Sequence, residues 1–69
     1  MSMKDSILEL AKLAVHQRNL LAGEFGVNEV TDRRVIDAVE NAGFVAGESD
    51  DPEQMLLLVD GEPVDVSEW

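Results

Sequence analysis

One segment near the carboxyl end of the sequence constrains the fold most, because it joins two extended apolar runs through a strong turn signal. The run 55–59 (Met-Leu-Leu-Leu-Val) is followed by Asp60-Gly61 and then by 62–66 (Glu-Pro-Val-Asp-Val). Asp-Gly is favoured in two-residue type I′ turns, which connect antiparallel strands and fix their register. The predicted hairpin pairs are Val59 with Glu62, Leu57 with Val64, and Met55 with Val66.

Alternation along this hairpin leaves a second face that also carries apolar side chains. It holds Leu56, Leu58 and Pro63. Proline donates no hydrogen bond to a ladder, so we expect its strand at the edge of the sheet. The two leucines need cover, and the first helix, Trp69 and a partner protein are the open alternatives.

Two helices are predicted before the hairpin. Residues 2–22 contain neither glycine nor proline, Ser2 is a suitable N-cap, and Gly23 is the expected stop. A second helix is expected to open at Thr31, with Val30 packing on Val35, and to end at Gly43.

The remaining segments complete the fold. Residues 44–46 suit a first strand and residues 47–54 a polar loop. We predict one α+β domain over residues 1–69, with two helices followed by a three-stranded antiparallel meander.

At about 100° per residue, apolar side chains cover a broad arc of the first helix, which we expect to face the core. Arg18 is the one charged residue on this arc, whose apolar members are Met3, Ile7, Leu8, Leu10, Ala11, Ala14, Val15, Leu21 and Ala22. The polar arc holds Asp5, Glu9, Lys12, His16 and Asn19. Leu13 and Leu20 lie just beyond the polar arc, where either the rest of the chain or a second copy can cover them. Phe25 and Val27, in the connection that follows, are expected in the core.

The charge is distributed unequally along the chain. Fifteen Asp and Glu against five Lys and Arg give a net charge of −10, and residues 1–34 sum to zero. The second half has no Lys or Arg, and its acids are Asp37, Glu40, Glu48, Asp50, Asp51, Glu53, Asp60, Glu62, Asp65 and Glu68. A field of one sign attracts basic partners and repels nucleic acid phosphates. A surface that serves only solubility is the alternative reading.

Sequence patterns for catalysis, metals and cofactors are missing. The chain has no cysteine, a single histidine (His16), no phosphate-binding glycine motif and no serine in a nucleophile elbow. The acids at 48–53 depart from EF-hand spacing because Pro52 interrupts them. We therefore expect a protein without enzymatic activity, metal or cofactor.

Residues 35–44 (Val-Ile-Asp-Ala-Val-Glu-Asn-Ala-Gly-Phe) resemble the second helix and turn of heavy-metal-associated ferredoxin-like domains. The Cys-x-x-Cys metal loop of that family is absent and the order of elements differs, so no residue role is carried over. In size and charge, the chain is similar to small acidic inhibitors from phages and other mobile elements, including anti-CRISPR and anti-restriction proteins.

Two functional hypotheses follow from these patterns. The first is a binding module or inhibitor that engages a basic surface of a partner protein, including surfaces that bind nucleic acid, through the ten acids of the second half. The alternative is a small accessory subunit that forms a homodimer through Leu13, Leu20, Leu56 and Leu58. No apolar run is long enough to span a membrane and the first residues lack signal-peptide character, so we expect a cytoplasmic protein.

Overall fold

The computed structural model describes residues 3–66, and it confirms the predicted α+β order of two helices and an antiparallel meander. The helices are α1 (Met3–Phe25) and α2 (Glu29–Asn41), and the strands are β1 (Val45–Glu48), β2 (Met55–Val59) and β3 (Glu62–Val64). The strands lie in the order β1-β2-β3, so β2 is central. Ser2, Glu68 and Trp69 lie outside the described residues.

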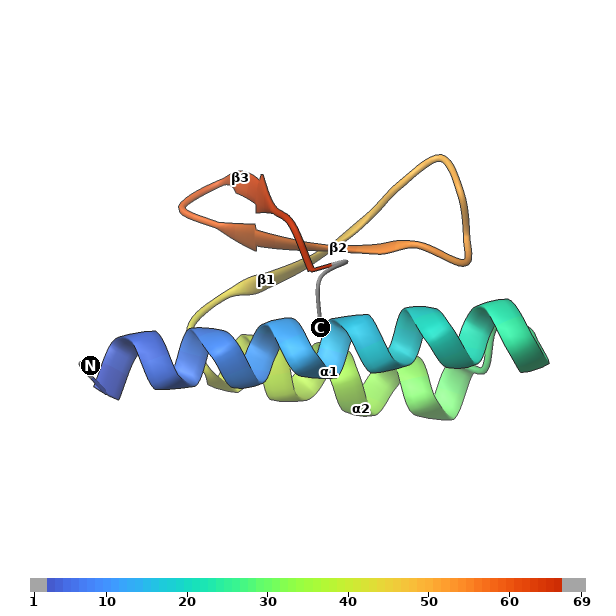
Figure 1. Ribbon diagram of the computed structural model, residues 1–69, viewed down its shortest axis with the longest axis horizontal. Helices are drawn as coiled ribbons and strands as arrows, with labels where there is room; N and C mark the ends of the chain where they lie inside the picture. Colours follow the sequence, from blue (N-terminus) through green and yellow to red (C-terminus); the bar gives the residue numbers. More distant parts are fainter. Residues whose placement is uncertain (1–2, 67–69) are drawn as a thin grey trace.

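The molecule has two layers, with the helices on one side and the sheet on the other (Figure 1). Its extents are 35 × 20 × 20 Å, and α1 runs along the long dimension. The first helix contacts α2 and β2, whereas α2 also contacts β1. The fully buried side chains Val15, Val39 and Leu57 come from α1, α2 and β2, so the core lies where these three elements meet.

The hairpin forms with the predicted register near its turn. Leu57 pairs with Val64 and Val59 with Glu62. Asp60 and Gly61 have φ values of 54° and 83°, the left-handed pair that a type I′ turn requires. Pro63 lies on the edge strand β3, as expected.

The predicted pairing of Met55 with Val66 is not formed, because β3 ends at Val64. Both backbone groups of Met55 are instead bonded to the side chain of Asn19 from α1. Met55 N donates to Asn19 Oδ1 at 2.8 Å, and Asn19 Nδ2 donates to Met55 O at 3.2 Å. The side-chain amide supplies the donor and acceptor that a peptide group of a third strand would supply.

The predicted junction between the helices is wrong at both ends. The first helix continues through Gly23 to Phe25. Gly26 follows it at φ 89°, and its backbone N donates to Ala22 O at 2.9 Å. The second helix begins at Glu29, because Asn28 rather than Thr31 caps it by accepting from the N–H groups of Val30 and Thr31. Sequence rules permit either glycine and either cap, so local preference alone leaves the junction undecided.

Several residues predicted in the core are exposed. Phe25 is 79% exposed, and Met3, Leu10, Leu21 and Val27 are also exposed, as is Val30, which was predicted to pack on Val35. The covered side of α1 is narrower than predicted and includes Ala11, Val15 and Ala22 together with the polar residues Arg18 and Asn19. Since α2 and β2 are the elements packed against α1, they cover part of its apolar arc and leave the rest in solvent.

Candidate partner-binding site

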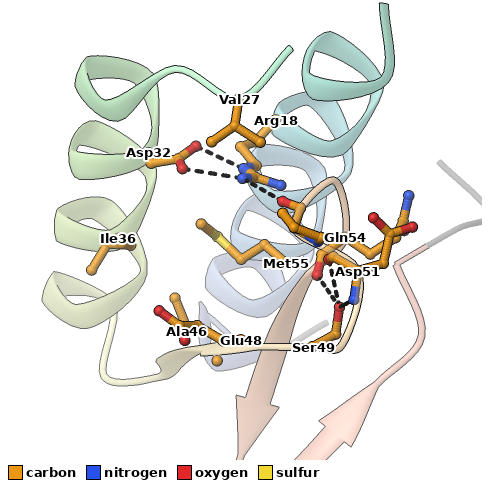
Figure 2. Close-up of a pocket in the computed structure, with 12 residues that line it drawn as sticks. Arg18, Val27, Asp32, Ile36, Ala46, Glu48, Ser49, Asp51, Gln54 and Met55 are labelled. Atoms are coloured by element: carbon orange, nitrogen blue, oxygen red, sulfur yellow. Dashed lines mark hydrogen bonds and ion pairs between the residues drawn. The ribbon is translucent and has the colours of Figure 1, made fainter.

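The centre of the candidate site is a buried arginine that three segments share. Arg18 is only 4% exposed, and its Nε and Nη2 donate to the two carboxylate oxygens of Asp32 at 2.7 and 3.1 Å. Its Nη2 also donates to Pro52 O at 3.0 Å. The arginine therefore holds the first turns of α2 and the β1–β2 loop against α1 (Figure 2).

Asn19, predicted on the polar arc, is 7% exposed and lies beside this arginine. Its Oδ1 accepts from Arg18 Nη1 at 3.1 Å as well as from Met55 N. Two neighbouring residues of α1 thus bond to α2, to the β1–β2 loop and to the start of β2. A buried polar network in which each group has a partner fixes the relative position of the elements it joins.

The acidic loop between β1 and β2 is folded on itself by hydrogen bonds. The Ser49 hydroxyl lies 2.8 Å from Asp51 O and 2.6 Å from Gln54 O, and it accepts from Asp51 N–H. Asp51 Oδ1 accepts from Glu53 N–H at 2.9 Å, which is an Asx turn. These bonds and the Arg18 contact to Pro52 O position the loop carboxylates.

A surface cavity of about 370 Å³ lies between α2, β1 and this loop. Ile36, Ala46 and Met55 form apolar parts of its lining, and in Figure 2 the Met55 side chain extends from β2 towards α2. The charged lining residues are Arg18, Asp32, Glu48 and Asp51, which sum to −2. Because Asp32 already pairs with Arg18, the charge available to a ligand is that of Glu48 and Asp51.

The nine predicted binding acids that the structure describes are all exposed, and they fall into three groups. The end of β1 and the loop after it hold Glu48, Asp50, Asp51 and Glu53; the hairpin and the residue after β3 hold Asp60, Glu62 and Asp65; and α2 holds Asp37 and Glu40. The loop and the hairpin turn lie at opposite ends of β2 (Figure 1). Of these nine acids, Glu48 and Asp51 line the cavity, and the others lie outside its lining.

The leucines predicted to contact a second copy fall into an exposed pair on α1 and a half-buried pair on β2. Leu13 and Leu20 are exposed on α1, whereas Leu56 and Leu58 are half-buried in β2. A Cβ atom at Gly47 would lie 3.1 Å from Leu58 Cδ1, so the missing side chain of this glycine leaves room for Leu58 over β1. Leu56 and Leu20 line a common surface cavity of about 450 Å³ together with His16.

Within residues 3–66, no group of three or more metal-ligating side chains could hold a metal ion. None of the helices described is both long and apolar enough to cross a membrane. No known protein family, curated protein or solved structure matches the chain. The function is therefore inferred from geometry and charge.

The sequence prediction missed the network of Arg18, Asn19 and Asp32 and the cavity beside it. One signal was present, because Arg18 was the single charged residue on the apolar arc. A buried charge requires a partner, and Asp32 is 14 positions away.

Proposed function

We propose that the protein is a non-catalytic binding module that engages a basic segment of a partner protein at the acidic cavity beside the β1–β2 loop. One observation carries the proposal: Glu48 and Asp51 line a cavity whose only lining cation, Arg18, is already bonded to Asp32. A lysine or arginine of the partner would place its aliphatic stem on the apolar lining and its charged end at these carboxylates.

The size of the cavity supports a side chain or short peptide segment as the ligand. Its volume of about 370 Å³ falls at the lower end of the roughly 300–1,000 Å³ range of small-molecule pockets. The hairpin and α2 acids, outside the cavity, would add long-range attraction that speeds encounter with a basic surface. The same field would repel nucleic acid phosphates, so the partner is a basic protein surface, such as one that binds nucleic acid.

The direct test is an NMR titration of the isotopically labelled protein with a short arginine- and lysine-rich peptide, capped at both ends. We expect shift changes concentrated at Ile36, Ala46, residues 48–52 and Met55. Affinity should weaken as salt rises from about 0.05 M to 1 M, because the screening length falls from about 14 Å to about 3 Å. An affinity that is indifferent to salt would contradict the proposal.

A charge-matched pair of variants distinguishes the cavity from the overall negative charge. Glu48→Gln with Asp51→Asn should weaken peptide binding about three- to tenfold, since exposed ion pairs contribute about 0.2–1 kcal/mol each. The control, Asp60→Asn with Glu62→Gln, removes the same charge at the other end of β2 and should retain most of the affinity. Equal losses in the two variants would show diffuse attraction and overturn binding at the cavity.

A further inference from the structure

A second surface, separate from the acidic cavity, carries exposed leucines along α1. Leu10 is 66% exposed, Leu13 40%, Leu20 50% and Leu21 46%; these four side chains are called the leucine stripe. Leu10 and Gln17 are seven residues apart, as are Leu13 and Leu20. This repeat is that of a helix packed along another helix. None of the four leucines lines the acidic cavity, so the two surfaces are independent.

The leucine stripe lies away from the packed side of α1, although Leu20 and Leu21 at its two edges line surface cavities shared with the hairpin and with α2. The buried residues Ala11, Val15 and Ala22 define the side that packs on α2 and β2. In Figure 1, α1 lies in front of α2 and below the sheet, and no other helix or strand is drawn over its near side. Four exposed leucines on one arc of a helix place more apolar surface in solvent than scattered single residues do, which is a mark of an interaction site.

The chain exposes more surface than the average for a compact monomer of its mass. A monomer of this mass is expected to expose about 4,300 Å², whereas this chain exposes 4950 Å². The excess of about 650 Å² approaches the roughly 800 Å² that each partner buries in a standard protein interface. The helix is 23 residues long, or about 35 Å, so a second helix laid along it has enough length to cover that area.

Charge favours a second copy of this chain as the occupant. The arc of α1 that carries the leucine stripe holds Ser6, Ala14 and Gln17 between the leucines, and no charged residue between Met3 and Glu24. Glu9 lies at the border of this arc, and its Oε1 is 3.7 Å from Lys12 Nζ, so its charge is paired. The net charge of −10 arises entirely after Arg34, outside α1. Two copies can therefore approach through α1 without bringing their net charges into the contact.

We infer that the protein forms a two-fold symmetric dimer in which the α1 helices of two copies pack antiparallel through the leucine stripe. The orientation follows from Glu24, which shares the seven-residue repeat with Leu10 and Gln17. A parallel pair would place the two Glu24 carboxylates together at the negative ends of both helices. An antiparallel pair places each Glu24 near the positive N-terminal turn of the other copy, and Leu10 opposite Leu20 and Leu21.

Sedimentation equilibrium or light scattering tests the dimer directly. Over about 10–500 µM we expect a mass of about 15 kDa, twice the 7.6 kDa of one chain. Leu10→Glu combined with Leu21→Glu should raise the dissociation constant about a hundredfold or more and return the mass to that of one chain. Both leucines are exposed, so far-UV circular dichroism should show an unchanged fold.

The matched control is Val30→Glu combined with Val45→Glu, which adds the same two charges at positions 66% and 53% exposed on α2 and β1. It should remain a dimer. A wild-type mass of one chain at every concentration would overturn the inference. Dissociation of the control to the same extent as the stripe variant would also overturn it, because added charge alone would then explain the effect.

Disulfide trapping tests the orientation without relying on a destabilised variant, since the chain has no cysteine of its own. Under mild oxidation, a mixture of the Leu10→Cys and Leu20→Cys proteins should form a mixed disulfide, and neither protein alone should form one. Cross-linking of each variant with itself, or no cross-linking in the mixture, would contradict antiparallel packing. The peptide-binding test of the acidic cavity is unaffected by either result.

Discussion

Arg18 shows how a single residue can determine the arrangement of a small protein. Its position on the apolar arc of α1 indicated burial, and the structure adds what burial requires, a bidentate contact with Asp32 and a bond to Pro52 O. Five of the bonds made by Arg18 and Asn19 either cross to α2 or connect segments that lie 34 or 36 residues away. Sequence spacing cannot reveal such partners, because it holds no information on how the helices and the sheet pack together.

At this scale we predict that Asp32→Ala lowers the free energy of unfolding by about 3 kcal/mol. The substitution leaves the Arg18 charge buried without its carboxylate, and breaking a buried ion pair typically costs about 3–5 kcal/mol. The 21% exposure of the Asp32 side chain places the expected loss at the low end of that range. Urea unfolding followed by circular dichroism measures it.

The control is Asp37→Ala, an exposed acid on the same helix, which should change stability by less than about 0.5 kcal/mol. The combination of Arg18→Met with Asp32→Leu should recover part of the loss, because removing both charges leaves neither one buried and unpaired. A double variant less stable than Asp32→Ala would contradict this account of the ion pair.

Among the elements, the hairpin was the most predictable and the helix junction the least. Asp60-Gly61 requires one turn type, and that turn fixes the pairs nearest to it, so local chemistry was sufficient. At the junction, Gly23 and Gly26 both satisfy the rules for a helix end. The structure, which joins Arg18 to the first turns of α2, selects the later glycine. The cavity was not predictable for the same reason, since its lining combines residues from α1, α2, β1 and β2.

The N-terminus of α2 gives a prediction that separates the observed cap from the predicted one. Asn28 Oδ1 accepts from Val30 N at 2.9 Å and Thr31 N at 3.1 Å, so Asn28→Ala should destabilise the protein by about 1 kcal/mol. Thr31→Ala should cost less, because Thr31 lies inside the helix. Denaturant titration of the two variants compares them, and a larger loss for Thr31→Ala would contradict the cap seen in the structure.

At the scale of the whole molecule, the net charge of −10 on 69 residues produces self-repulsion that salt should relieve. We expect screening by sodium chloride to contribute about 1 kcal/mol between about 0.05 M and 1 M, which raises the Tm by roughly 4–8 °C. Calorimetry at one protein concentration measures the change.

The variant with Asp60→Asn and Glu62→Gln carries two fewer negative charges and should show a smaller increase. A Tm that falls with added salt would mean that attractive ion pairs, rather than repulsion between carboxylates, dominate the electrostatic free energy of the folded state.

The bonds of Arg18 and Asn19 also bear on the order of folding. Their partners are 14, 34 and 36 positions away, so the chain must close long loops before any of these bonds can form, whereas the hairpin needs only its own turn. We expect the hairpin to form early and this junction late. The bonds of Arg18 and Asn19 would then form last, and their formation would couple the helices and the sheet into a single cooperative unit.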